Sequence, residues 1–218
     1  MKKRLIIALV LLFLLSTYKP QKLFLSTKFN IKEIQIENNL ILKNKEIKKN
    51  LNFLYDSNLF FLKKKKIEDQ LKKLNFIESF EVKKVYPNNL KIKIFEKQPI
   101  AILQYKKEKF FINEKVDLIN YIDLKNYRNL PIVFGSKDDF KVLYVNLKEM
   151  GFPLNLIRRY YSYESKRWDL ETEKKQIIKL PVKNYTKSLK NFMSIKEKKN
   201  FDKYKVFDYR INNQLILK

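Results

Sequence analysis

Residues 71–105 carry the clearest alternation of apolar and polar positions in the chain. Leu90–Glu96 (LKIKIFE) alternates apolar and charged residues, which is typical of a strand with one face in water. The segment 81–86 predicts a preceding strand, and 87–89 (PNN) supplies the turn between the two. The segment 99–103 continues as a strand after a break at a proline, which cannot donate to a ladder. We therefore expect two antiparallel strands followed by a third.

The preceding sequence predicts one more strand and two helices. The segment 29–37 (FNIKEIQIE) alternates like a strand, and Asn38-Asn39 forms a turn. A helix is expected over 45–55 with Asn44 as its N-cap, and a second over 63–75. The inward residues of the two helices are Ile47, Leu51, Leu54, Ile67, Leu71 and Leu74. The order β-α-α-β-β over 29–103 predicts a small α+β domain.

The second half of the chain, 104–218, predicts a β-rich domain of antiparallel strands with two helices. The strand segments are 109–119 around a turn at 113–115, the short strand 129–135, the hairpin 165–172 with 176–181, and the final hairpin 204–211 with 214–218. A helix capped by Asp138 or Asp139 is expected to run to Met150, with Val142, Val145 or Leu147, and Met150 inward. A second helix is expected over 184–195, with Tyr185, Leu189 and Phe192 on one side.

An apolar segment lies at the N-terminus. Residues 1–4 (MKKR) precede eleven uninterrupted apolar residues, 5–15, and another lysine follows at position 19. We interpret residues 5–21 as a single transmembrane helix, an uncleaved signal anchor, with residues 1–4 as a cytoplasmic tail. The run is shorter than the ~20 residues of a comfortable span, so cleavage as a signal peptide stays open. In either case the bulk of the chain is exported.

The composition argues against an enzyme. The chain has no cysteine, no histidine and two glycines, which removes the commonest nucleophile, general base, metal ligand and phosphate-binding loop. We expect no catalytic residue, cofactor, metal or small-molecule substrate. The net charge of +25 suggests nucleic acid, but arginine, which base readout favours, is scarce and lysine is spread throughout. We therefore expect no nucleic-acid partner.

These segments together resemble a known family. The helix ending at Phe76, followed by the pattern V-x-K-x-x-P-x-x-L-x-I-x-I-x-E-x-x-P-I-A over 82–101, resembles the last helix and final strands of a POTRA domain. The spacing of Glu96, Pro99 and Ala101 resembles the FtsQ/DivIB family of bacterial division proteins. Later segments also resemble this family in order: FINEKVDLI (111–119), NLPIVFG (129–135), KRWDL…IIKLP (166–181) and FDYRINNQLILK (207–218).

The resemblance implies a non-catalytic scaffold of the division machinery. Members bind the small coiled-coil membrane proteins FtsB and FtsL and through them influence septal peptidoglycan synthesis. The resemblance implies a single-pass inner-membrane protein at the division septum, with its N-terminus in the cytoplasm and its bulk in the periplasm. It also implies that the partner segment adds along the edge of the C-terminal strand.

A terminal strand is physically suited to such binding, because no later strand covers its N–H and C=O groups. We expect the partner edge to consist of Arg210, Ile211, Asn213, Leu215 and Leu217. By the resemblance, Arg210 matches an arginine that pairs with an acidic group of the partner. Leu215 and Leu217 are alternatively ordinary core, in which case Ile216 points the opposite way.

Other residues have simpler interpretations. Lys63–Lys66 is a solvated first helical turn rather than an anion site, and Trp168 is a core residue rather than a ligand-stacking one. Asp169 and Glu171 are interpreted as solvated carboxylates rather than an acid/base pair.

The alternative function is that of a POTRA-bearing periplasmic protein for outer-membrane transport or assembly, for which the sequence after the first domain is short. A cell-wall hydrolase lacks a catalytic constellation in this sequence.

Overall fold

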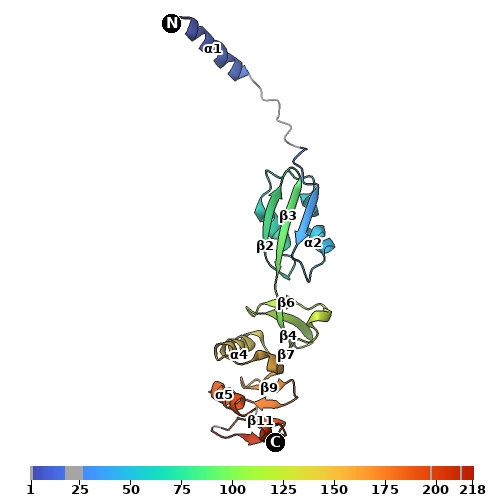
Figure 1. Ribbon diagram of the computed structural model, residues 1–218, viewed down its shortest axis with the longest axis vertical. Coiled ribbons are helices and arrows are strands. Elements are labelled where there is room, and N and C mark those ends of the chain that lie inside the picture. Colours follow the sequence, from blue (N-terminus) through green and yellow to red (C-terminus); the bar gives the residue numbers. More distant parts are fainter. Residues whose placement is uncertain (1, 18–26, 197, 212) are drawn as a thin grey trace. The chain divides into compact units, whose positions relative to one another are not determined.

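The protein is described by a computed structural model that covers residues 2–17, 27–196, 198–211 and 213–218. The chain divides into two compact units, Met1–Glu96 and Lys97–Lys218. Unit 1 contains a three-stranded sheet of order β1-β3-β2, and unit 2 a nine-stranded sheet of order β12-β11-β10-β9-β8-β7-β4-β5-β6 (Figure 1). The mixed α+β fold expected from the sequence is confirmed.

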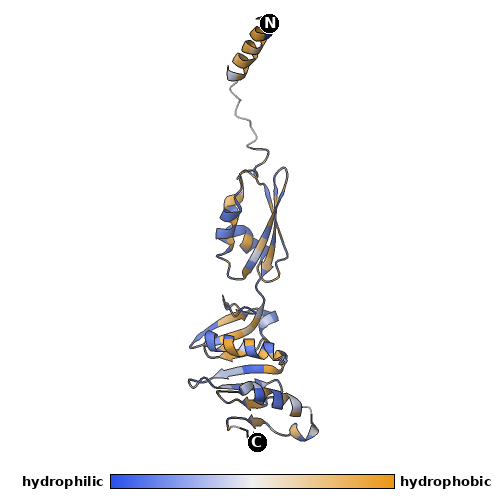
Figure 2. Cartoon of the chain, turned by 90° about the vertical axis from the view of Figure 1, so that its left-hand side faces the viewer, coloured by the Kyte–Doolittle hydropathy of each residue, from blue (hydrophilic) through white to orange (hydrophobic). Residues whose placement is uncertain are grey.

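The first helix, α1 (Lys2–Thr17), holds the apolar N-terminal segment. Figure 2 shows most of this helix in the hydrophobic colour, and its residues from Leu5 to Leu15 are exposed. None of the helices in the described ranges combines the length and the apolarity needed to cross a membrane. The last four residues of the expected anchor, 18–21, lie outside the described residues.

The rest of unit 1 has the predicted β-α-α-β-β order. Its elements are β1 (Glu33–Glu37), α2 (Asn44–Asn50), a 3-10 turn (Asn52–Leu54), α3 (Lys64–Leu71), β2 (Ile77–Val85) and β3 (Asn89–Glu96). The central strand β3 pairs in parallel with β1 and antiparallel with β2. The apolar face of both helices and of the sheet is buried, and the six inward helical residues predicted from the sequence all lie in the core.

Three local expectations for unit 1 are wrong at the ends of elements. The first strand begins at Glu33, because Asn30 and Ile31 instead pair with Asn58 and Ser57 of the loop before α3. Asn44 is the first helical residue and not the cap; the preceding Lys43 makes no capping bond with its side chain. The two helices are shorter than predicted, because α2 ends at Asn50 and tightens into the 3-10 turn, and α3 ends at Leu71.

A buried carboxylate closes the loop between β1 and α2. The side chain of Glu96, at the end of β3, accepts hydrogen bonds from the main-chain N–H groups of Leu40 (2.9 Å), Ile41 (2.8 Å) and Leu42 (2.8 Å). Asn38, in the left-handed conformation at φ 63°, donates from its amide to the carbonyl of Ile94. The loop's main-chain donors are therefore satisfied by one side chain that lies 54 to 56 residues away in the sequence.

Unit 2 consists of one long sheet with two α-helices. Its strands are β4 (Pro99–Tyr105), β5 (Glu108–Asn113), β6 (Leu118–Asn120), β7 (Ile132–Phe134), β8 (Ile157–Ser162), β9 (Trp168–Thr172), β10 (Ile177–Lys179), β11 (Val206–Asp208) and β12 (Ile216–Leu217). Its helices are α4 (Lys137–Glu149) and α5 (Tyr185–Ile195), with 3-10 turns at Lys125–Tyr127, Leu154–Leu156 and Lys199–Phe201. The predicted hairpin β9–β10 is confirmed. The expectation of purely antiparallel strands is wrong, because β4–β7, β7–β8 and β10–β11 pair in parallel.

Both helices of unit 2 cover the same face of the sheet. Phe140 of α4 packs edge-on against Tyr160 of β8, at 5.3 Å between ring centroids, and Phe192 of α5 packs against Phe207 of β11 at 5.0 Å. The cross-strand register places Leu170, Ile178 and Phe207 in one row on this face. Trp168 is buried beside them, so its interpretation as a core residue is confirmed.

Two expectations for α4 are wrong. Its cap is Ser136, whose Oγ accepts from the N–H of Asp139, so neither Asp138 nor Asp139 is the cap. Val142 is exposed at 62%, so its expected inward position is wrong, whereas Leu147, the alternative to Val145 (41% exposed), is buried and Met150 packs partly buried against the core. The rest of the buried face is Phe140, Leu143 and Tyr144. The helix begins two or three residues earlier than expected, and the apolar stripe that faces the sheet starts at Phe140.

Candidate functional site: the edge of the C-terminal strand

The last strand, β12, forms one edge of the nine-stranded sheet, and β6 forms the other edge within the described residues. Antiparallel pairing aligns Ile216 with Asp208 and Leu217 with Phe207. Lys218 and Val206 exchange two main-chain hydrogen bonds, at 3.0 and 3.1 Å. Because bonded and non-bonded pairs alternate in an antiparallel ladder, the main-chain groups of Leu217 face away from β11. β12 therefore presents an open edge at which another chain can pair.

The side chains of β12 divide between two faces. Leu215 and Leu217 are partly buried against the core below the helices, which is the alternative that the sequence left open for them. Ile216 lies on the opposite face and is exposed at 38%, in a row with Asp208 and Lys179. The side chains of the two leucines thus pack the C-terminal segment against the core, while the main-chain groups of Leu217 point to the open edge.

Arg210 is paired within its own chain. Its Nε donates to both carboxylate oxygens of Asp208, at 2.9 and 3.0 Å, and its Nη2 donates to Oδ2 at 2.6 Å. The side chain of Asp208 is only 6% exposed, whereas that of Arg210 is 43% exposed. The guanidinium lowers the pKa of Asp208 mainly through these hydrogen bonds. A guanidinium carries five N–H donors, so a partner's carboxylate can bind to Arg210 in addition to Asp208.

A second carboxylate lies on the same face of the sheet, two strands away. Asp169 is buried, accepts from the hydroxyl of Tyr163 at 3.1 Å, and has Arg167 Nε at 3.5 Å. Burial raises the pKa of Asp169. Glu171, on the same face, is 14% exposed in its side chain and is bound by Arg159 at 2.6 Å. The interpretation of Asp169 and Glu171 as solvated carboxylates is therefore wrong, because basic side chains of neighbouring positions cover both.

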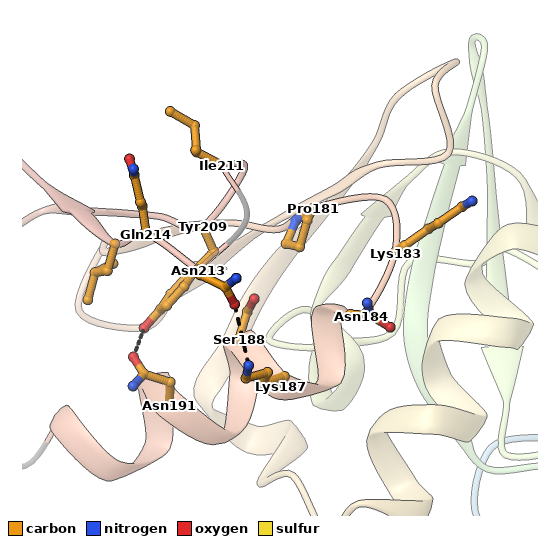
Figure 3. A pocket seen from close by; sticks show the side chains of 11 residues that line it. Pro181, Lys183, Asn184, Lys187, Ser188, Asn191, Tyr209, Ile211, Asn213 and Gln214 are labelled. Carbon is orange, nitrogen blue, oxygen red and sulfur yellow. Dashed lines mark hydrogen bonds between the residues drawn. The ribbon is translucent and has the colours of Figure 1, made fainter.

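The turn that leads into β12 borders a depression of about 420 Å³. Figure 3 shows this pocket between the first turns of α5 and the C-terminal turn. Asn213, at φ 59°, accepts from Lys187 Nζ at 3.4 Å, and the hydroxyl of the buried Tyr209 donates to Asn191 Oδ1 at 2.9 Å. The charged residues of the lining are Lys183 and Lys187. The pocket is therefore cationic.

The pocket brings together three of the five residues expected at the partner edge, namely Ile211, Asn213 and Leu215. Arg210 and Leu217 do not line it. Sequence reasoning missed the other lining residues, among them Lys183, Lys187 and Tyr209. The parallel pairing of β10 with β11 places the helix between them beside the C-terminal turn, and no sequence signal indicated that pairing.

The fold and the open edge define a class, a protein with a POTRA-type domain followed by a β-rich domain. A family model described as "POTRA domain, FtsQ-type" matches residues 29–97. The chain is 30% identical to the cell division protein FtsQ of Rickettsia prowazekii over 85% of this chain and 71% of that protein. It is 29% identical to FtsQ of Rickettsia conorii over 92% of this chain and 77% of that protein. The chain belongs to the FtsQ family of cell division proteins.

A solved structure is also similar. It is the major extracytoplasmic domain of the division protein DivIB from Geobacillus stearothermophilus, at 15% identity and a TM-score of 0.33, covering 46% of this chain and 92% of that domain.

Proposed function

We propose that this protein is a non-catalytic, membrane-anchored scaffold of the bacterial divisome. In this role it binds FtsB- and FtsL-like partners at the edge of β12 and links them to septal peptidoglycan synthesis. Membership of the FtsQ family supports the role in division. The observation that carries the binding mode is the open edge of β12, where the main-chain groups of Leu217 face away from the sheet.

Charge and shape support an acidic partner segment. The pocket beside the C-terminal turn carries Lys183 and Lys187, and Arg210 keeps donors that Asp208 does not occupy. A partner strand added to β12 would place its side chains next to the pocket and next to Arg210. Its main-chain hydrogen bonds would then supply affinity, and its carboxylates would supply specificity. The predicted partner residues are Arg210, Ile211, Asn213, Leu215 and Leu217.

We propose that α1, with the residues that follow it, anchors the protein in the inner membrane, leaving residues 1–4 in the cytoplasm and the bulk in the periplasm at the septum. A helix that is apolar on all sides is stable only in an apolar environment. The sixteen residues of α1 extend for about 24 Å, a little less than the ~30 Å of a hydrocarbon core. Lysine and arginine side chains at its ends can reach the headgroups and lengthen the span.

The test compares two substitutions at one residue. Leu217→Pro removes the N–H that faces the open edge and leaves the ladder bonds to β11 in place, whereas Leu217→Ala removes the packing of the side chain but keeps the N–H. Each full-length variant is used to capture FtsB- and FtsL-like proteins from membranes of the source cell. The Leu217→Pro chain should capture at least about tenfold less of them than the Leu217→Ala chain.

Equal capture by both variants would refute the binding mode at β12. Comparison with a chain that ends at Tyr209 then distinguishes a site within residues 210–218 from one elsewhere in the chain. A folded full chain that captures no division protein would refute the scaffold function itself.

A further inference from the structure

Unit 1 has an exposed aromatic cluster at one end. The rings of Phe29, Phe60 and Tyr86 pack on one another, with centroid distances of 4.7 Å (Phe29–Phe60), 5.0 Å (Phe60–Tyr86) and 6.3 Å (Phe29–Tyr86). Phe60 is 48% exposed, Tyr86 52% exposed, and the adjacent Phe61 81% exposed. We call these four residues the aromatic end. A cluster of large, solvent-exposed apolar side chains is typical of a surface that binds a protein or a membrane.

Main-chain hydrogen bonds fix the position of the aromatic end within unit 1. The N–H of Leu59 donates to the carbonyl of Phe29 at 2.9 Å, and that of Lys32 donates to Asn88 in the β2–β3 turn at 2.9 Å. Three segments therefore meet where β3 begins. The chain leaves unit 1 after Glu96, at the other end of the eight-residue strand β3. The aromatic end is thus the end at which the chain enters from α1.

The same three segments are strongly basic. Residues 27–32, 56–66 and 83–89 carry eight lysines and one carboxylate, Asp56. The whole chain has 48 basic and 23 acidic residues, so the excess here is well above what its general lysine content supplies. The lysines other than Lys84 are exposed, and Lys84 Nζ donates to the carbonyl of Phe60 at 3.1 Å. Positive charge is therefore concentrated on the three segments that carry the exposed rings.

Exposed aromatic rings on strongly basic segments have the chemistry that binds the surface of an anionic lipid bilayer. Tyrosine and phenylalanine insert at the level of the headgroups, and lysines near the surface are attracted to anionic lipids. Ten residue steps separate Thr17 at the end of α1 from Thr27, a reach of at most about 35 Å. Such a short tether would keep the aromatic end close to the bilayer that holds α1, so that even a weak affinity for lipid would keep it bound most of the time.

We propose that the aromatic end of unit 1 rests on the anionic surface of the membrane that holds α1. This inference depends on the membrane anchoring under Proposed function and adds a second contact to it. It assigns the partner of this surface by its chemistry, as anionic phospholipid headgroups with the upper part of the acyl chains.

The chain offers a matched pair of probe positions. Phe61 is 81% exposed at the aromatic end, and Leu40 is 83% exposed at the opposite end, where its N–H binds Glu96. Because the chain has no cysteine, Phe61→Cys and Leu40→Cys each give one site for an environment-sensitive fluorophore. Both residues are apolar and exposed, so each variant should fold.

The full chain carrying either label is reconstituted into vesicles of phosphatidylcholine and phosphatidylglycerol that contain a spin-labelled lipid quencher. The label at Phe61 is expected to be quenched at least about twofold more strongly than the label at Leu40, with a blue-shifted emission. The difference should shrink in phosphatidylcholine alone. Equal quenching at the two positions would overturn the proposal, and equal strength in the neutral vesicles would overturn the assignment to an anionic surface.

Flotation of the same vesicles separates this inference from the anchoring on which it rests. A chain that floats with the vesicles but shows no difference between the two labels is anchored, and only the surface contact is wrong. A chain that does not float is not anchored, and both the membrane anchoring by α1 and the surface contact of the aromatic end are then wrong. Capture of FtsB- and FtsL-like proteins by the floated material reports on the scaffold function independently of either label.

Discussion

The two units differ in how far their exposed main-chain N–H and C=O groups are protected from pairing with another chain. In unit 1, the loop between β1 and α2 is closed by Glu96, which accepts three N–H groups, and the edge strand β2 carries four charged residues among nine. In unit 2, the edge strand β12 is the apolar pair Ile216 and Leu217, with an open outer side. Charged side chains on an edge strand discourage pairing with another chain, and their absence permits it. The edge of β2 in unit 1 is therefore less suited to pairing with another strand than the edge of β12 in unit 2.

The largest effect on stability is expected at the closed loop of unit 1. Glu96→Gln keeps the shape of the side chain but replaces one acceptor oxygen by a donor facing N–H groups. We expect unfolding of unit 1 to become easier by about 2–4 kcal/mol. The single tryptophan, Trp168, lies in unit 2, so urea unfolding followed by circular dichroism should shift while the tryptophan fluorescence transition stays in place.

Glu37→Gln is the control for this prediction, because Glu37 is half exposed and forms an exposed ion pair with Lys91. It should change the stability of unit 1 by less than about 0.5 kcal/mol. A similar shift for both variants would show that the closed loop adds little.

The next largest effect is expected beside the open edge. Arg210 holds the pKa of the buried Asp208 below its ordinary value, so the unfolded chain takes up the proton more readily than the folded one. The stability from this pair is therefore present above the unfolded pKa of about 4 and is lost as the pH falls toward the folded pKa. Asp208→Asn should cost about 1–2 kcal/mol at neutral pH and remove this part of the acid dependence.

Tryptophan fluorescence measures the Asp208→Asn effect, since Trp168 and Asp208 lie in the same unit. Asp123→Asn is the control, because its bidentate pair with Arg128 is exposed on both sides. We expect no measurable shift for it. An unchanged acid profile in Asp208→Asn would contradict the role assigned to Asp208.

The smallest effect is expected at the charged edge of unit 1. Glu81→Val with Lys83→Val makes one exposed face of β2 apolar and should alter stability by less than about 0.5 kcal/mol. The double variant is instead expected to self-associate, which sedimentation at several concentrations detects. A variant that stays monomeric would show that features other than charge protect this edge.

Sequence pattern predicted the regular parts of the molecule well. The alternation over β3 and the buried stripes of α2 and α3 are local properties, and a local property can be read from neighbouring residues. The caps at Asn44 and Asp138 were wrong because several polar residues compete at each helix start. β8 (IRRYYS) was missed, since it shows neither alternation nor a continuous apolar run.

Features that join distant segments could not be predicted in this way. The residue Glu96 was recognised by its spacing to Pro99, but its three donors lie more than fifty residues earlier. Likewise, the sequence predicted that the final strand carries the partner edge, whereas the pocket beside it depends on the parallel pairing of β10 and β11 across α5. For the candidate site, sequence therefore identified the strand and not its surroundings.

The parallel pairing of β1 with β3 has a mechanical consequence. The chain enters the part of unit 1 that follows α1 before the start of β1 and leaves it after the end of β3, and Ile34 to Glu37 pair with Leu90 to Lys93. Tension applied to the two ends therefore acts along the strands and loads all bonds of this ladder together, in shear. Tension on β2 and β3 at Ile77 and Glu96, which are paired neighbours, would instead open their bonds one at a time. Unit 1 is thus built to resist stretching between its entry and its exit.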